Sequence, residues 1–61
     1  MNKRTRNIVV PKHKAKEVKE LLCEITGVWP FSSEYGDDIY VQTEMTDEEA
    51  AKADHRLEMI L

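Results

Sequence analysis

The sequence predicts a compact α+β domain with the element order β-α-β-β-α, in which two helices lie on one face of a three-stranded antiparallel-type sheet. Two stretches carry apolar residues at helical spacing, and three short β-branched or alternating stretches precede or separate them. The chain has 61 residues, of which 34% are charged. A soluble chain of this size can build one small core, so residues 7–61 are expected to form a single α+β domain.

The chain begins with a basic segment and a short predicted strand. Residues 1–6 are polar and basic without periodicity, which predicts a mobile basic arm. Asn7 to Val10 is typical of a strand, and Pro11 should end it, because proline has no N–H to donate and its fixed φ suits the first turn of a helix. We expect that helix to run from Pro11 to about Thr26 and to stop at Gly27. Its core-facing stripe should consist of Ala15, Val18, Leu21, Leu22 and Ile25.

The middle of the chain predicts two further strands joined by a turn. Val28 to Ser33 is expected to be a strand with large side chains at period two, although the proline inside it restricts it to an edge or a bulge. Glu34 to Asp38 has turn composition, and Ile39 to Thr43 alternates apolar with polar residues. For Trp29 and Phe31 two interpretations stay open, and packing in the core is favoured over an exposed binding contact, because few other large side chains are present to fill the core.

A capping-box sequence predicts the start of the second helix. Thr46 should be the N-cap and Glu49 should reach back to it. The apolar stripe that follows consists of Ala50, Ala53, Leu57, Ile60 and Leu61. We therefore expect this helix to face the core up to the last residue.

This element order resembles a ferredoxin-like split βαβ fold without its last strand. The resemblance implies that the third strand lies between the first and the second, and it implies no function. Ile8 to Val10 would then form an open edge, which is a template for another strand. One hypothesis is a homodimer, or strand addition to a partner, through this first-strand edge. The alternative is that the basic arm and Pro11 guard the edge.

Residues that usually carry chemistry are sparse. His13, Cys23 and His55 do not have the spacing of metal ligands. Residues 35–38 resemble in sequence the metal-binding hairpin of viral RNA-dependent polymerases. A chain of 61 residues has no room for the rest of such an enzyme, so a turn is the better interpretation. No phosphate-binding loop or nucleophile elbow is evident. The sequence therefore predicts a protein that is not an enzyme and that uses no cofactor and no metal.

Charge is divided along the chain. The net charge is −3, but residues 1–19 hold seven basic residues and one acid, a net charge of +6, whereas residues 20–61 carry −9. The basic part supports a nucleic-acid-binding module as the alternative function. Tyr40 should face away from the helices and would then be a stacking platform for a base. The cations expected to face one phosphate backbone are Lys3, Arg4, Arg6, Lys12, Lys16 and Lys19.

The acidic part of the chain indicates a different surface. Carboxylates bracket the predicted hairpin and the start of the second helix, where they would present spaced negative charge to a basic groove. The candidate acidic surface consists of Glu34, Asp37, Asp38, Glu44 and Glu48. Acids in the first turn of a helix also stabilise the positive end of its dipole, so part of this cluster has a structural role.

The preferred function is a small non-enzymatic protein-interaction module, a regulator or inhibitor of a larger protein, as phage and bacterial accessory proteins often are. Its candidate binding residues are Ile8, Val9, Val10, Trp29, Phe31 and Met59. No apolar run exceeds three residues, so no segment is expected to span a bilayer, and no secretory signal is evident. We expect a cytoplasmic protein with a protein partner and no membrane partner.

Overall fold

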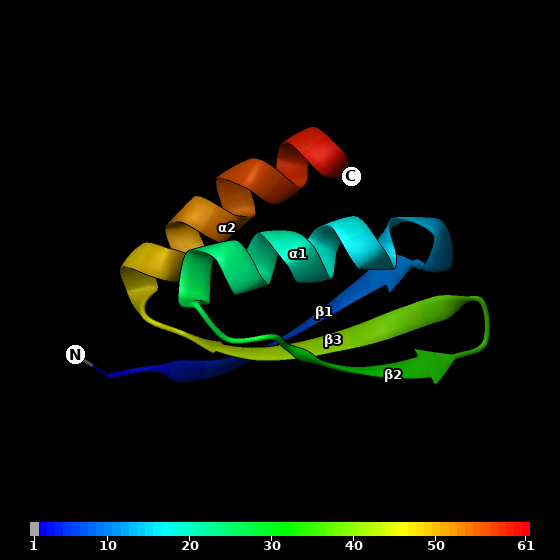
Figure 1. Ribbon diagram of the computed structural model, residues 1–61, viewed down its shortest axis with the longest axis horizontal. Helices are drawn as coiled ribbons and strands as arrows, with labels where there is room; N and C mark the ends of the chain where they lie inside the picture. Colours follow the sequence, from blue (N-terminus) through cyan, green and yellow to red (C-terminus); the bar gives the residue numbers. More distant parts are fainter. Residues whose placement is uncertain (1) are drawn as a thin grey trace.

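The computed structural model describes residues 2–61 as two layers, with both helices on one face of a three-stranded sheet (Figure 1). The element order is β-α-β-β-α, with a short 3-10 turn before the first helix. The bounds are β1 Arg4–Pro11, η1 Lys12–Lys14, α1 Ala15–Thr26, β2 Phe31–Tyr35, β3 Asp38–Met45 and α2 Asp47–Ile60. The predicted fold class is therefore confirmed.

β3 is the central strand of the sheet. The strand order is β1-β3-β2 and both pairings are antiparallel, as the element order predicts. Tyr40 of β3 lies between Val9 of β1 and Ser33 of β2. Burial alternates along β3, so that Ile39 and Val41 are buried while Tyr40 is exposed. The helices thus cover one face of the sheet and leave the other face uncovered (Figure 1). Tyr40 is exposed and points opposite to the buried Ile39 and Val41, so it lies on the uncovered face as predicted.

The core lies between the sheet and the helices. Val18 and Leu22 of α1 are fully buried, as are Val10 and Val41 from the sheet below. Burying one such side chain contributes about 1.5–3 kcal/mol, so this layer of contacts is the main source of stability. The buried apolar residues are Val10, Ala15, Val18, Leu21, Leu22, Ile39, Val41, Met45, Ala50, Ala53 and Leu57, with Ile8, Ile25 and Ile60 packed against them.

β1 begins earlier than the sequence predicts. Arg4 already pairs with Met45, and the pairing continues without interruption to the end of the strand. The assignment of residues 4–6 to a mobile arm is therefore wrong, because backbone pairing with a long central strand does not require apolar side chains at every position. Residues 2–3 have no regular secondary structure, and Met1, the rest of the predicted arm, lies outside the described residues.

The first helix begins later than predicted. Pro11 is the last residue of β1, and its φ of −61° leads into the 3-10 turn, so that α1 begins at Ala15. The helix ends as expected at Gly27, whose φ of 78° makes a left-handed C-cap. The Thr26 hydroxyl donates a hydrogen bond of 2.8 Å to the carbonyl of Leu22 and completes this end of the helix.

The second strand is displaced from its predicted position. β2 begins at Phe31, not at Val28, and joins β3 through a turn of two residues. The first turn residue is Gly36 with a φ of 65°, and the described part of the chain has no non-glycine residue with positive φ. This combination fits a type II′ turn, which matches the twist of the flanking strands. The turn places Tyr35 directly opposite Asp38.

α2 begins with the predicted capping box. The Glu49 N–H donates to the Thr46 hydroxyl over 3.2 Å, and the Thr46 N–H donates to the Glu49 carboxylate over 2.9 Å. The expectation that the core-facing stripe includes Leu61 is wrong, because α2 rises away from the sheet toward its end and leaves Leu61 exposed (Figure 1). The Lys14 ammonium donates a hydrogen bond to the carbonyl of Ile60 in this last turn. None of the described helices is both long and apolar enough to span a membrane.

Candidate functional site

The uncovered side of the sheet, which we call the open face, is defined by the strand register. Residues paired across antiparallel strands point to the same side of a sheet, and successive residues of a strand point to opposite sides. Tyr40 therefore shares its side with its partners on both neighbouring strands and with every second residue from them. The open face consists of Thr5, Asn7, Val9, Pro11, Phe31, Ser33, Tyr35, Asp38, Tyr40, Gln42 and Glu44.

Four large apolar side chains on the open face are exposed, and we call them the open-face patch. The exposed fraction is 82% for Phe31, 72% for Tyr35, 50% for Val9 and 43% for Tyr40. The rings of Tyr35 and Tyr40 contact each other edge to face, with centroids 5.5 Å apart. A small domain that leaves aromatic side chains together in water has a surface suited to an apolar partner.

Charge on the open face is exclusively negative within the described strands. Asp38 and Glu44 are its charged residues, and every basic residue of β1 lies on the helical side by alternation. Arg6 shows this directly, because its guanidinium lies 3.7 Å from the carboxylate of Asp54 on α2. Arg4, in the same alternation, lines a hollow at the start of α2 together with Glu48.

The predicted basic cluster does not form one surface. Lys12 lies 3.7 Å from the carboxylate of Glu34 on β2, and Lys19 lies 3.3 Å from the hydroxyl of Ser32. Lys16 is exposed on α1. Tyr40, the predicted stacking side chain, is on the opposite side of the sheet from these helical lysines. The structure therefore separates Arg6, Lys12 and Lys19 from the aromatic platform that a nucleic-acid site would combine. Lys3 is different, because it lines a hollow together with Phe31 and Glu44.

The candidate acidic residues are also divided between the two sides. Glu34 faces the helical layer and is paired with Lys12, whereas Asp38 and Glu44 belong to the open face. Asp37 lies in the hairpin turn, and Glu48 belongs to the first turn of α2. The structure therefore does not bring the five carboxylates of the candidate acidic surface together on one side of the protein.

One carboxylate has a purely structural role. Glu49 caps α2, and the hydrogen bond from the backbone N–H of Thr46 is the main reason that the pKa of Glu49 lies below its ordinary value. Its charge stabilises the positive end of the helix and is not offered to a partner.

The free edge of β1 offers backbone rather than side chains. β1 is paired on one side, by β3, so its other edge is open as predicted. The side chain of Val10 is fully buried and that of Ile8 is half-buried, and Val9 belongs to the open-face patch. Arginines along this strand and the proline at its end are features by which natural proteins protect an edge from pairing.

Trp29, Phe31 and Met59 are exposed. Their exposed fractions are 54%, 82% and 78%, so the expectation that Trp29 and Phe31 pack in the core is wrong. The core is instead filled by aliphatic side chains and Met45. Of the residues that join α1 to β2, Pro30 is buried, whereas Gly27, Val28 and Trp29 are exposed. Met59 lies near the end of α2 and is thus remote from the open face.

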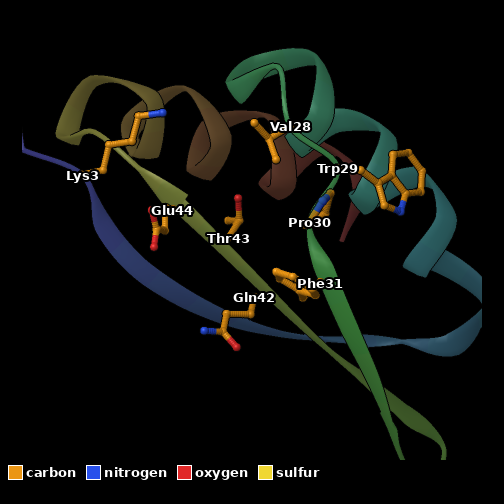
Figure 2. Close-up of a pocket in the computed structure, with 8 residues that line it drawn as sticks. All are labelled: Lys3, Val28, Trp29, Pro30, Phe31, Gln42, Thr43 and Glu44. Atoms are coloured by element: carbon orange, nitrogen blue, oxygen red, sulfur yellow. The ribbon is translucent and has the colours of Figure 1, made fainter.

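A hollow of about 300 Å3 lies where β2 begins (Figure 2). Its wall is built from the chain that leads into β2 and from the second half of β3. The lining residues are Lys3, Val28, Trp29, Pro30, Phe31, Gln42, Thr43 and Glu44. Figure 2 shows Val28 and Thr43 on either side of this space, while the indole of Trp29 is turned away from β3.

The described residues contain no group of three or more metal-ligating side chains. Cys23 is a free thiol, half-buried on α1. Comparison of the chain with protein-family models, with curated proteins and with solved structures finds no match. The function of the open face is therefore inferred from the side chains that form it.

Sequence reasoning missed Tyr35 and most of the hollow. The composition of residues 34–38 predicts a turn at Tyr35, whereas a two-residue turn made of Gly36 and Asp37 alone predicts a strand residue opposite Asp38, as observed. With that register, Tyr35 falls on the same side as Phe31 and Tyr40. The hollow has no comparable signal, because it depends on where β2 begins relative to β3.

Proposed function

We propose that this protein is a non-enzymatic interaction module that binds a larger protein through the open face and modulates its activity as a regulator or inhibitor. The observation that carries the proposal is the open-face patch, in which Val9, Phe31, Tyr35 and Tyr40 are exposed on the same side of the sheet. Burying such side chains against a partner removes apolar area from water, which is the main favourable term in protein association.

A protein partner fits this face better than a nucleic acid does. The charged residues of the open face are carboxylates, Asp38 and Glu44, which repel a phosphate backbone. Two of the cations counted toward a nucleic-acid site, Arg6 and Lys12, are next to carboxylates within the protein itself. The nucleic-acid hypothesis is thus supported by composition, and the protein-binding hypothesis by the arrangement of the side chains.

The test is capture from a host-cell lysate with tagged protein in three forms. One is the wild type, one carries Phe31→Thr and Tyr35→Thr, and the matched control carries Met59→Thr. Threonine suits a strand, so the double variant removes aromatic area while it keeps the strand propensity. Met59 is as exposed as the two aromatic residues but lies on α2. Capture is repeated after nuclease treatment and at low and physiological salt.

We expect a protein that the wild type and Met59→Thr retain, and that the double variant loses although it still folds and unfolds cooperatively on heating. Retention should survive nuclease and change little with salt, because contacts between apolar surfaces are not screened. Equal retention by all three forms would contradict the proposal. Material that disappears with nuclease and with salt would instead support the nucleic-acid alternative.

A further inference from the structure

β2 is an edge strand with an open outer side. The strand order is β1-β3-β2, so within residues 2–61 the neighbour of β2 in the sheet is β3 alone. All residues of β2 are exposed, and the helices pack mainly on β3 and β1 rather than on β2. The outer edge of β2 is therefore accessible to a further strand.

Ser32 and Glu34 present their backbone groups at this open edge. In an antiparallel sheet the N–H and C=O groups of one residue point to the same neighbouring strand, and those of successive residues alternate. Tyr35 and Asp38 flank a two-residue turn and exchange both hydrogen bonds, so Tyr35 directs its groups to β3. By alternation, the N–H and C=O groups of Ser32 and Glu34 point away from β3 and have no neighbouring strand.

The strand is complementary to a second copy of itself. When two copies of β2 run antiparallel about a two-fold axis at Ser33, Ser32 of each copy faces Glu34 of the other. The outward backbone groups of these two residues then bond to each other across the edge. The pairing covers the whole strand, from Phe31 to Tyr35, and Pro30, which has no N–H to donate, lies just outside it.

On the open face, this register joins the aromatic residues of the two copies. Phe31 of one copy lies directly opposite Tyr35 of the other, in a pair without mutual backbone bonds, where side chains come closest. Both rings are largely exposed in the single chain, and aromatic cross-strand pairs stabilise a sheet. Ser33 meets its own copy at the axis, where a small side chain leaves the rings room.

On the helical side, the same register brings opposite charges together. The Ser32 hydroxyl lies 3.3 Å from the ammonium of Lys19, and the Glu34 carboxylate lies 3.7 Å from that of Lys12. Glu34 of the second copy arrives opposite Ser32 and thus beside Lys19. Each Glu34 then lies between a lysine of its own chain and a lysine of the other chain.

The neighbouring registers lack this complementarity. With the axis at Glu34, the carboxylates of the two copies would face each other directly, and like charges in that position destabilise a sheet. With the axis at Ser32, Glu34 would face Pro30, which cannot donate the hydrogen bond that the position requires. The axis at Ser33 is therefore the favoured one.

We infer that the protein forms a two-fold symmetric homodimer in which β2 pairs with β2 of a second copy. The product is a continuous antiparallel sheet with three strands from each copy. An interface limited to one pair of short strands is small, so we expect a dissociation constant of about 1–100 μM. The inference is independent of the proposed function, because edge pairing leaves the open face of each copy uncovered.

The first test measures self-association by sedimentation equilibrium for two proline variants. Ser32→Pro removes an N–H from the outer edge of β2 and keeps the hydrogen bonds between β2 and β3. Asn7→Pro is the matched control on the free edge of β1. Gln42 bonds to β2, so its partner Asn7 directs its own N–H to that outer edge.

The second test uses charge and leaves the backbone unchanged. Glu34→Lys and Lys19→Glu each place like charges across the edge pair, so each variant should associate less than the wild type does. An equimolar mixture of the two variants restores opposite charges at both sites of a mixed dimer. The measurement is again sedimentation equilibrium, on each variant alone and on the mixture.

We expect Ser32→Pro to weaken the dimer about tenfold or more, because two hydrogen bonds are lost by symmetry, and Asn7→Pro to leave it unchanged. Each charge variant alone should weaken it about fivefold, and the mixture should recover association. A wild type that stays monomeric up to about 1 mM would overturn the inference. So would a dimer that Ser32→Pro leaves intact while Asn7→Pro disrupts it. If a proline variant does not unfold cooperatively, the charge variants decide, and a mixture that associates no better than its components contradicts the pairing.

Discussion

Tyr35 and Tyr40 contact each other edge to face on the open face, with ring centroids 5.5 Å apart and ring planes at 72°. Tyr35 comes from β2 and Tyr40 from β3, where they are diagonal neighbours across the strand pair. This contact links the edge strand to the central strand on the side that no helix covers. It gives part of the patch a fixed shape before any partner binds.

The aromatic contact should be measurable as a coupling free energy. Replacing Tyr35 or Tyr40 by alanine removes the same edge-to-face pair, so the two substitutions together should cost less than the sum of the single ones. We expect a coupling of about 0.5–1 kcal/mol in the free energy of unfolding, obtained from a double-mutant cycle in urea. Strict additivity of the two substitutions would show that the rings do not interact in solution.

Leu22 should be among the most sensitive positions of the core. It is fully buried in α1 above the sheet, so Leu22→Ala should lower the free energy of unfolding by about 2–5 kcal/mol through lost transfer energy and a residual cavity. Glu20→Ala, at an exposed position of the same helix, should change it by less than about 0.5 kcal/mol. Chemical denaturation checks both values, and similar effects of the two substitutions would contradict the placement of α1.

The hairpin turn should depend on glycine at its first position. Gly36 has a φ of 65°, which costs a residue with a side chain about 1–2 kcal/mol, although a Cβ there would meet no neighbouring atom. Gly36→Ala should therefore lower stability through the backbone alone. Asp37→Ala, at the second turn position without positive φ, should have a smaller effect in the same unfolding experiment.

The capping box should make stability depend on pH. The pKa of Glu49 is lowered in the folded protein, mainly by the backbone hydrogen bond from Thr46, so the carboxylate stabilises the fold above its unfolded pKa of 4.5. This contribution is lost as the pH falls through the lower folded value. We expect Glu49→Gln to be less stable than the wild type at pH 7 and the difference to shrink below about pH 4. If the unfolding midpoints of the wild type and Glu49→Gln differ by the same amount at every pH from 7 to 2.5, the Glu49 carboxylate does not have this role.

The helical lysines should be dispensable for partner binding. Lys12, Lys16 and Lys19 lie on the helical side, away from the open face, so replacing all three by glutamate should leave capture of the protein partner unchanged. The same variant should lose any nucleic-acid affinity that the wild type shows in low salt. Loss of the protein partner in this variant would move the interface to the helical side.

Periodicity was sufficient to predict the layers of this fold. Val18 and Leu22 lie on one stripe of a helix, and this spacing predicts its buried side. Ile39 and Val41 alternate with polar residues, which predicts the buried side of a strand. The structure packs these two sides against each other in a two-layer core. The capping box at Thr46 was equally local, because both partners lie within four residues. Such features depend on the spacing of neighbouring residues and are visible in the sequence.

The binding surface was less predictable, because it depends on strand lengths and on register. Nothing local distinguishes an aromatic residue in the core from one on an uncovered face. The sequence therefore favours a core position for Phe31, whereas β2 begins at this residue and directs its side chain outward. Arg4 to Arg6 lack apolar alternation and join the sheet through the backbone of β3. β3 also continues beyond Gln42, its last partner with β2, because the two strands differ in length, and no residue pattern encodes this difference.

The most direct test of the open face as a binding surface is an NMR map of the 15N-labelled protein in the presence of its captured partner. We predict that amide signals of the open face, among them those of Val9, Ser33 and Tyr40, lose intensity while those of exposed positions on α1 and α2 such as Lys16 and Met59 stay sharp. Loss concentrated on the two helices, with the open face unaffected, would contradict the proposal that this side of the sheet binds the partner.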